Sequence, residues 1–387
     1  MFRFKLKAET FNKLQRRLVG VAASDKDAEV IFTLEESKLT VRYRSKLGRS
    51  ETTSLFSEIL DTSESENTGS STILVQELTG IRLEPMSKEG KFPFTEDIQF
   101  HFQNSVLRTN WKVNHTDKRS SEVKLAHAIK ENLPDLSAFT KLDNLPDNFI
   151  NMQGPLFQET ISYCNLFKMD ATSKTSNGCL FEVSGDFLVA VGTDSIVASK
   201  FKAPIDSQHI TDGFRLVLDS SVLIFIKTFI NDLDNIKLSA SKRFLFISSE
   251  GRSMCVPTMN VIYNIKDPEE FFKVDSPFIG TIDPSPVISV LNTLTHLSTD
   301  VHSKIMLDFN SGNFNVSTSK NSSEHLPCDL VSEALINVNS GLFLTSIKKL
   351  ESFEKSPVQL FFNIKNRRIM LSSKEKELVF LIQGMRD

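Results

Sequence analysis

A strand followed by an amphipathic helix opens the chain, and the same plan returns twice further along the sequence. Each copy begins with alternating apolar residues, the period of a half-buried strand, and continues with apolar residues three and four positions apart, the period of a helix. The three strand–helix pairs are 2–7 with 9–21, 149–152 with 154–167, and 278–282 with 284–297. A repeat of such long period predicts one structural plan that is used three times.

A second helix is expected later in each repeat. Helical spacing predicts these helices at 75–83, 219–231 and 340–353, with Asp219 and Ser340 as suitable N-cap residues. Strand-like runs occur around them at 39–43, 98–102, 244–248, 314–317 and 358–364. The 387 residues exceed the usual range of a single domain, so the sequence predicts a multidomain α+β protein.

The breaks between the repeats suggest where the domains end. Proline residues and charges mark joints at 126–148 and 265–277, which divide the chain into domains 1–136, 137–270 and 271–387. The polar, turn-rich run 61–72 lies inside the first of these domains and is predicted to be an exposed loop.

Composition excludes several classes of protein. The net charge is −3, so a surface that is basic throughout is excluded, although a local basic patch is compatible with this total. The 4 cysteines contain no C-x-x-C pair and are expected to be reduced. The first residues lack the apolar segment of a signal peptide, and no apolar run approaches the roughly 18 to 20 residues of a membrane span. We therefore expect a cytoplasmic protein without a membrane partner.

Motifs for catalysis or cofactor binding are absent from the sequence. It contains no P-loop, G-x-G-x-x-G, H-E-x-x-H, EF-hand or G-x-S-x-G pattern. The 7 histidines are scattered, which does not favour a metal site. Thr193 and Asp194 resemble a dyad, but an Asp that caps its own turn is the more ordinary interpretation. No catalytic residue, metal or cofactor is predicted, and the chain is not expected to be an enzyme.

One basic patch stands out on the first predicted helix. Lys13 is three residues before Arg16 and four before Arg17, so the three cationic side chains are predicted to project together, away from the apolar face. Lys227, Lys348 and Lys349 are further cations on predicted helices. These residues are compatible with non-specific contact to nucleic-acid phosphates. An ordinary solvated helix face is the alternative interpretation.

Residues 177–205 form the most distinctive stretch of the sequence. Alternation from Cys179 to Val183, the turn at Gly185 and the apolar run 187–191 predict a meander of three strands. The wording of this stretch, with its Asn-Gly, Leu-Phe-Glu and Thr-Asp, resembles the middle domain of the bacterial sliding clamp, the β subunit of the replicative DNA polymerase. Residues 2–22, 133–136 and the closing run 379–387 are similar to corresponding parts of that family.

The resemblance implies a fold and a function. Members of the family have three α+β domains per subunit, each with two helices that line a central pore and antiparallel sheets outside. Two subunits form a homodimeric ring around duplex DNA, and the ring tethers the DNA polymerase as a processivity factor after a clamp loader has opened it. The basic residues Lys13, Arg16, Arg17, Lys227, Lys348 and Lys349 would then lie in the pore.

The resemblance also implies a pocket for partner peptides between the second and third domains. Carried over by position, its residues are Thr193, Ser195, Ile196, Val197, Ala198, Pro268, Val274, Leu342, Leu381, Met385 and Arg386. An apolar groove at a domain boundary suits a peptide that is anchored by a few apolar side chains. The alternative for each position is a plain core residue.

Two departures from the family pattern affect this pocket. Ser195-Ile196-Val197-Ala198 stands where the family has Gly-His-Arg-Leu, and Gly384 stands where it has Pro. Such divergence suits a phage- or plasmid-encoded member. A β-rich structural or virion assembly protein, without dependence on DNA topology, is the alternative function.

Overall fold

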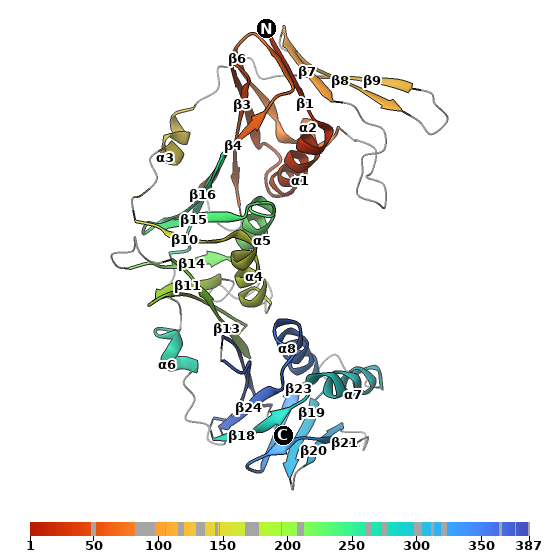
Figure 1. Cartoon of the computed structure of the whole chain (residues 1–387), viewed down its shortest axis with the longest axis vertical. Coiled ribbons are helices and arrows are strands. Elements are labelled where there is room, and N and C mark those ends of the chain that lie inside the picture. Colours follow the sequence, from red (N-terminus) through yellow and green to blue (C-terminus); the bar gives the residue numbers. More distant parts are fainter. Residues whose placement is uncertain are drawn as a thin grey trace. The chain divides into compact units, whose positions relative to one another are not determined.

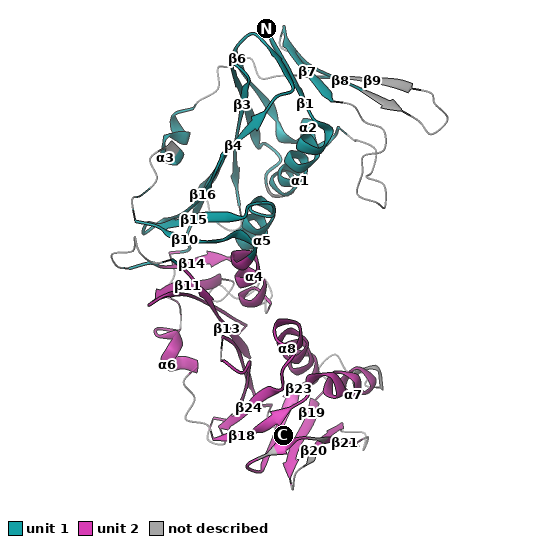
Figure 2. Cartoon of the chain, viewed as in Figure 1, with its two compact units in different colours: residues 1–155, 206–214, 221–259 teal, residues 156–205, 215–220, 260–387 magenta. Residues whose placement is uncertain are grey.

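The computed structural model describes residues 1–47, 52–81, 97–104, 106–114, 120–128, 136–143, 146, 148–166, 178–194, 196–206, 213–260, 263, 265–272, 277–297, 304–310, 313–318, 323–363, 366–375 and 377–385. The chain divides into two compact units (Figures 1 and 2). Unit 1 comprises Met1–Pro155, Asp206–Phe214 and Ser221–Met259, and unit 2 comprises Leu156–Ile205, Arg215–Ser220 and Asn260–Asp387. The three-domain division predicted from the sequence stays a prediction.

Unit 1 contains two antiparallel sheets. Their strands are β1 (Phe2–Leu6), β2 (Glu29–Glu35), β3 (Lys38–Lys46), β4 (Thr53–Asp61), β5 (Glu64–Glu66), β6 (Gly69–Leu74), β7 (Ile98–Gln103), β8 (Val106–Asn114), β9 (Ser120–Ala128), β10 (Ile150–Gln153), β15 (Asn235–Ala240), β16 (Phe244–Ser249) and β17 (Arg252–Pro257). One sheet has the order β5-β1-β7-β8-β9 and the other β10-β15-β16-β17-β4-β3-β2-β6. In the second sheet, β17 pairs with β4, so strands from distant parts of the sequence form one continuous sheet.

The helices of unit 1 pack on these sheets through phenylalanine-rich cores. They are α1 (Ala8–Ser24), α2 (Val75–Thr79), α3 (Thr140–Asp143) with the 3-10 turn Ser137–Phe139, and most of α5 (Ser220–Phe229). Phe11 of α1 meets Phe100 of β7 edge-on at 5.2 Å between ring centroids, and Phe4 of β1 stacks on the same ring at 5.0 Å. These aromatic contacts explain why one face of α1 is fully buried.

Unit 2 also contains two antiparallel sheets (Figure 1). Their strands are β11 (Gly178–Ser184), β12 (Phe187–Thr193), β13 (Val197–Pro204), β14 (Arg215–Asp219), β18 (Phe278–Ile282), β19 (Lys304–Asn310), β20 (Asn313–Thr318), β21 (Ser323–Pro327), β22 (Asp329–Leu330), β23 (Ala334–Asn339), β24 (Val358–Asn363), β25 (Arg368–Ser372) and β26 (Leu378–Gln383). The sheet orders are β14-β11-β12-β13-β26-β25-β24-β18-β22 and β21-β20-β19-β23. The pairing of β13 with β26 again joins distant segments in one sheet.

The helices of unit 2 are most of α4 (Gly154–Cys164), α6 (Pro268–Phe272), α7 (Pro284–Leu297) and α8 (Ser340–Phe353). The predicted helices at 284–297 and 340–353 are confirmed at both ends. The cap of α8 is a correction, because Asn339, and not Ser340, accepts the N–H of Leu342 at 3.1 Å. Ser340 lies inside the first turn and is buried.

The predicted loop at 61–72 is also a correction. This run contains the short edge strand β5 and the first part of β6, which pairs with β2. Its polar composition suggested a loop for two reasons. Strand β5 is largely exposed at a sheet edge, where polar residues are common, and Ser71 and Thr72 of β6 are buried polar residues in a strand. In the part of the chain that the structure describes, no helix is long and apolar enough to cross a membrane.

Candidate nucleic-acid and partner interfaces

Two of the three predicted cations on α1 lie on its exposed face. Phe11, Leu14 and Leu18 are fully buried, so helical geometry turns Lys13 and Arg16 toward solvent. The Nζ atom of Lys13 lies 2.9 Å from the Glu9 carboxylate one turn earlier, in an exposed ion pair. Such a pair contributes little to stability and leaves Lys13 able to meet an approaching anion.

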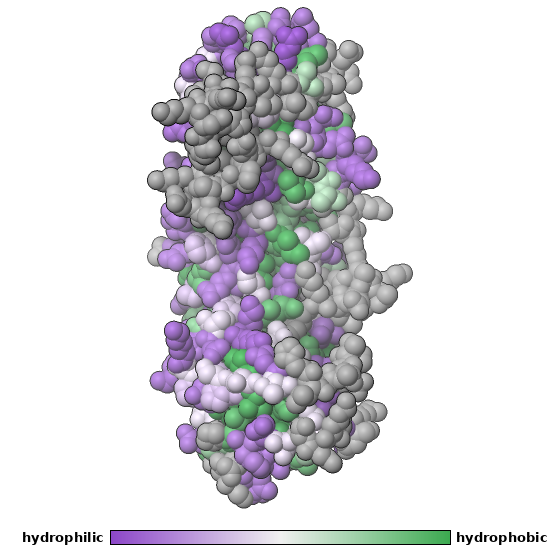
Figure 3. All heavy atoms as spheres, turned by 90° about the vertical axis from the view of Figure 1, so that its right-hand side faces the viewer, coloured by the Kyte–Doolittle hydropathy of each residue, from purple (hydrophilic) through white to green (hydrophobic). Residues whose placement is uncertain are grey.

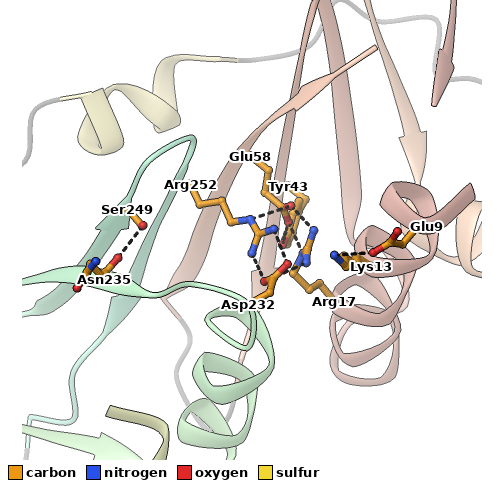
Figure 4. A network of polar contacts seen from close by, with 9 residues as sticks. All are labelled: Glu9, Lys13, Arg17, Tyr43, Glu58, Asp232, Asn235, Ser249 and Arg252. Atoms are coloured by element: carbon orange, nitrogen blue, oxygen red, sulfur yellow. Dashed lines mark hydrogen bonds and ion pairs between the residues drawn. The ribbon is translucent and has the colours of Figure 1, made fainter. Parts of the chain in front are cut away.

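Arg17 is a correction to the predicted patch, because its side chain is only 4% exposed and points into unit 1. Its Nε donates to Glu58 Oε1 at 2.9 Å and its second amino group to Oε2 at 2.6 Å, a bidentate pair with a carboxylate that is fully buried on β4 (Figure 4). The hydroxyl of Tyr43 on β3 donates to the same Oε1 at 2.9 Å. Arg17 therefore belongs to the interior and not to the exposed cations.

Arg252, on β17 next to β4, and Asp232, which follows α5, complete this polar network (Figure 4). Arg252 pairs with Glu58 in the sheet register and donates to Asp232 Oδ2 at 2.9 Å. The Arg17 guanidinium lies 3.9 Å from Asp232. Two guanidinium groups thus face two carboxylates, and the formal charge of the cluster is balanced.

The network changes the acidity of its members. The hydrogen bond from Arg252, together with the nearby positive charges, lowers the pKa of Asp232. Burial raises the pKa of Tyr43 well above its ordinary value, and the negative charge of Glu58 acts in the same direction. Tyr43 therefore stays protonated and remains a hydrogen-bond donor to Glu58.

The other predicted cations lie on separate helices. Lys227 on α5 and Lys348 on α8 are exposed, whereas Lys349 is half-buried. Lys348 Nζ donates to the Asn292 side chain of α7 at 3.0 Å. The exposed surface of these helices is mixed and not uniformly charged: Val19 on α1 is 53% exposed and Ile224 on α5 is 49% exposed. Figure 3 shows such hydrophobic areas among hydrophilic residues within each unit.

The turn between β12 and β13 is held by its own side chains. Asp194 Oδ1 accepts the N–H groups of Ile196 at 2.9 Å and Val197 at 2.7 Å, and the Thr193 hydroxyl donates to the Val197 carbonyl at 3.0 Å. The interpretation of Asp194 as a cap of its own turn is confirmed. The turn leaves the Ile196 side chain 50% exposed beside the sheet.

Several predicted pocket residues meet where β13 pairs with β26. Ala198 lies opposite Leu381, and Val197 opposite Ile382. Val197, Ala198 and Leu381 are buried, whereas Thr193, Leu342 and Met385 are partly exposed. The buried residues therefore form the sheet beneath any groove. Ser195, Val274 and Arg386 lie outside the described residues.

Helix α6 carries the pocket residue Pro268 and is fastened to two strands of the same sheet. The carboxylate of Glu269 pairs with two lysines of β13: its Oε2 lies 3.1 Å from Lys200 Nζ and its Oε1 lies 2.8 Å from Lys202 Nζ. Burial acts to raise the pKa of Glu269, but the hydrogen bonds from Lys202 and Lys200 outweigh this effect and lower it. On the other strand, the Arg368 guanidinium of β25 lies 5.7 Å from the Phe271 ring centroid, a cation–π distance.

The end of the chain is attached through three successive backbone N–H groups. Gln383 donates to the Ile196 carbonyl at 2.8 Å, Gly384 to Arg367 at 2.7 Å, and Met385 to Asn337 at 2.7 Å. A Cβ atom on Gly384 would lie 2.8 Å from the Arg367 carbonyl oxygen, closer than real contacts allow. The hydrogen bond from the backbone N–H excludes proline at this position, and the short contact with the Arg367 carbonyl oxygen disfavours any residue with a Cβ atom.

Sequence reasoning missed the partners of Arg17 and of Lys200. One signal was available for Glu58, since it takes an inward position between Phe56 and Leu60 on a strand with alternating burial. A carboxylate at such a position indicates a cation or hydrogen-bond donors beside it in the interior. Nothing local indicated which cation, because Arg17 is 41 residues away. Among the described residues, no cluster of His, Cys, Asp or Glu is placed to hold a metal ion.

Comparison with known proteins gives a clear result for the fold. No family model matches the sequence, and no curated protein matches it. Among solved structures, the DNA polymerase sliding clamp from Pseudomonas aeruginosa matches with a TM-score of 0.76 at 12% identity over 100% of both chains. The DNA polymerase III β subunits from Thermotoga maritima (TM-score 0.76, 8% identity, 100% of both chains) and Borrelia burgdorferi (0.72, 14%, 99% of both) match similarly.

The chain has the sliding-clamp fold. At these identities the likeness rests on backbone arrangement, and it extends over both units from end to end. The expected α+β architecture is confirmed.

Proposed function

We propose that the protein is a DNA sliding clamp, a homodimeric ring that encircles duplex DNA and tethers a DNA polymerase as a processivity factor. The observation that carries this proposal is the full-length match to sliding clamps, with no part of the chain left over for a separate activity. In this proposal the subunit has domains 1–136, 137–270 and 271–387, and a clamp loader opens the ring. The chain performs no catalysis itself.

Pore contact with DNA is supported by exposed cations on helices of the clamp fold. Lys13, Arg16, Lys227 and Lys348 are exposed, and each neutralised phosphate would release counterions. Long, mobile side chains without a fixed register do not read base sequence, which suits a ring that slides. Arg17 is left out of this set because Glu58 holds it inside unit 1.

Ring closure is supported by two sheet edges. Strand β9 ends the five-stranded sheet of unit 1, and β21 ends the four-stranded sheet of unit 2. In a head-to-tail dimer, β9 of one subunit would pair with β21 of the other. Two-fold symmetry would repeat this pairing at the second interface, so that the backbone groups of each edge strand would gain hydrogen-bonding partners. The peptide pocket for the polymerase would lie beside α6 and the turn at Ile196.

Electron microscopy of the purified protein at micromolar concentration tests the ring directly. We expect rings of two copies with a hole wide enough for duplex DNA. In a second experiment, the subunits are first separated by dilution and then allowed to reassemble in the presence of nicked circular DNA. The protein should stay on this circular DNA and should leave it when the DNA is linearised. Particles without a hole, together with equal retention on circular and linear DNA, would overturn the proposal and favour a structural protein.

A further inference from the structure

The face of the eight-stranded sheet that points away from α1 carries an apolar row beside a polar one. Glu58 of β4 binds Arg17 on the α1 side, so Leu55, three residues earlier on the same strand, points to the opposite face. Cys255 lies opposite Leu55 in the register, and Phe246 lies opposite Cys255, so these three buried side chains form one row. The next row of these strands on the same face consists of partly exposed serines: Ser57, Ser253 and Ser248. Water is thus excluded from one row of this face and reaches the other.

A short segment of the chain covers the apolar row. Residues 136–142, which we call the strap, comprise the 3-10 turn and the first part of α3 (Figure 1). Leu136, Phe139 and Leu142 recur at every third residue, the spacing that places side chains on one side of such a turn. Phe139 and Leu142 are buried against the row and against Ile31 of β2, and Leu136 packs against the same cluster. The sequence pattern of the strap therefore matches the surface that it covers.

Hydrogen bonds inside the segment help to give the strap its shape. The N–H of Phe139 donates to the Leu136 carbonyl at 3.0 Å, and the hydroxyl of Thr140 donates to the Ser137 carbonyl at 2.8 Å. The contacts of the strap with the apolar cluster are made by the side chains that recur at every third position. What the sheet recognises is therefore a short helical turn with this apolar spacing, and any chain that presents such a turn can make the same contacts.

We infer that the strap occupies a docking site in cis, and that a partner protein binds there by presenting a helical turn with the pattern Leu-x-x-Phe-x-x-Leu. The partner segment displaces the strap and takes its three apolar places on the row. The tether gives the strap an effective concentration of about millimolar, so a free segment competes weakly and a partner with further contacts competes better. This docking surface goes beyond the proposed function, because it requires neither DNA nor a closed ring, and its residues are not among those of the predicted peptide pocket.

The thiol of Cys255 can show whether the strap is in place. Cys255 is fully buried, and burial raises its pKa to about 12. Alkylation proceeds through the thiolate, so the covered thiol should react slowly and should react faster when the strap leaves. Labelling with N-ethylmaleimide, followed by peptide mass spectrometry, measures the rate at each cysteine separately. Cys164 and Cys179 are buried in unit 2 and serve as internal references for loosening elsewhere.

Leu142→Ala should raise the labelling rate of Cys255 on the order of tenfold or more, because the strap loses one of its two buried side chains. The probe is the peptide acetyl-Leu-Ser-Ala-Phe-Thr-Lys-Leu-amide, which should restore the protection of Cys255 in a saturable way. The same peptide with serine at its Leu and Phe positions should not. Fluorescence anisotropy with the labelled probe should show binding to the variant on the order of tenfold tighter than to the unmodified protein, where the intact strap competes.

Ser137→Ala, at an exposed position of the same turn, is the matched control and should leave Cys255 protected. If Leu142→Ala also speeds the labelling of Cys164 and Cys179, the milder Leu136→Ala takes its place, since Leu136 is only partly buried. An unchanged Cys255 rate in both variants, failure of the probe peptide to restore protection, or equal protection by the serine peptide would overturn the inference.

Discussion

Arg17 and Glu58 form a bidentate ion pair at 2.9 and 2.6 Å with both side chains almost completely excluded from solvent. The pair joins α1 to β4 at the point where β4 also pairs with β17. Burial of two charges is costly, and the geometry recovers that cost only while both partners are present. We expect the pair to fix the packing of α1 more strictly than apolar contacts alone would.

Replacing Glu58 by glutamine should strongly destabilise the protein. The substitution removes the bidentate partner of the buried Arg17 and leaves only Asp232, at 3.9 Å, as a counter-ion, so we expect the free energy of unfolding to fall by about 3–5 kcal/mol. Chemical denaturation monitored by the single Trp111 and by circular dichroism measures this change. Glu9→Gln is the control, since its exposed pair with Lys13 contributes at most about 1 kcal/mol. Equal effects of the two substitutions would contradict a buried ion pair.

Removing both charges should cost less than removing one. The double variant Arg17→Met and Glu58→Leu removes both members of the buried ion pair, so neither charge remains in the interior without the other. This variant should therefore recover a large part of the stability lost in Glu58→Gln. A double-mutant cycle with Arg17→Met and Glu58→Leu as the single variants measures the coupling. Strict additivity of the two single effects would show that the side chains do not interact.

Asp232→Asn should change how stability depends on pH. The pKa of Asp232 is lowered in the folded protein, so its stabilising effect is present above its unfolded pKa of about 3.9 and is lost as the pH falls through the folded value. The variant should be less stable than the unmodified protein at neutral pH, and the gap should close in acid. Thermal unfolding of both proteins between pH 7 and pH 2 measures this difference in stability. Asp61→Asn, at an exposed position, is the control substitution.

Gly384→Pro should loosen the attachment of residues 383–385. Proline has no N–H group for the Arg367 carbonyl, and its added atoms would crowd that oxygen. We expect a loss on the order of 1 kcal/mol and faster hydrogen exchange at the Met385 amide. Gly80→Ala is the control, because a Cβ atom there has an ordinary contact of 3.4 Å. Unchanged exchange at Met385 would show that the Gly384 bond does not hold the tail.

Lys13→Ala with Arg16→Ala should reduce the salt dependence of DNA binding. Loss of two phosphate contacts lowers the slope of log affinity against log salt by about 1.8, at roughly 0.9 per contact. Fluorescence anisotropy with a labelled duplex at several salt concentrations measures the slope. Lys242→Ala with Arg243→Ala removes the same charge from an exposed turn before β16 and should change the slope little. Equal changes in both variants would leave α1 no special role.

Local patterns were sufficient for most of the secondary structure and for the exposed cations. The helices at 284–297 and 340–353 could be predicted because apolar residues recur at helical spacing, and burial of one face follows from that spacing. The same rule turns Lys13 and Arg16 toward solvent. Helical spacing failed to predict the burial of Arg17. Whether a helical side chain points to solvent or to the interior also depends on the neighbouring elements, which were not known from the sequence.

What the sequence by itself determined is the set of elements and their repetition, since short-range periodicity reflects the geometry of single helices and strands. Only the tertiary structure decided which distant segments pair. The β17–β4 and β13–β26 pairings, the buried partner of Arg17 and the attachment of Gly384 to Arg367 join residues far apart in sequence. The physical reason is that a backbone edge or a buried charge accepts many partners, and global packing selects one of them.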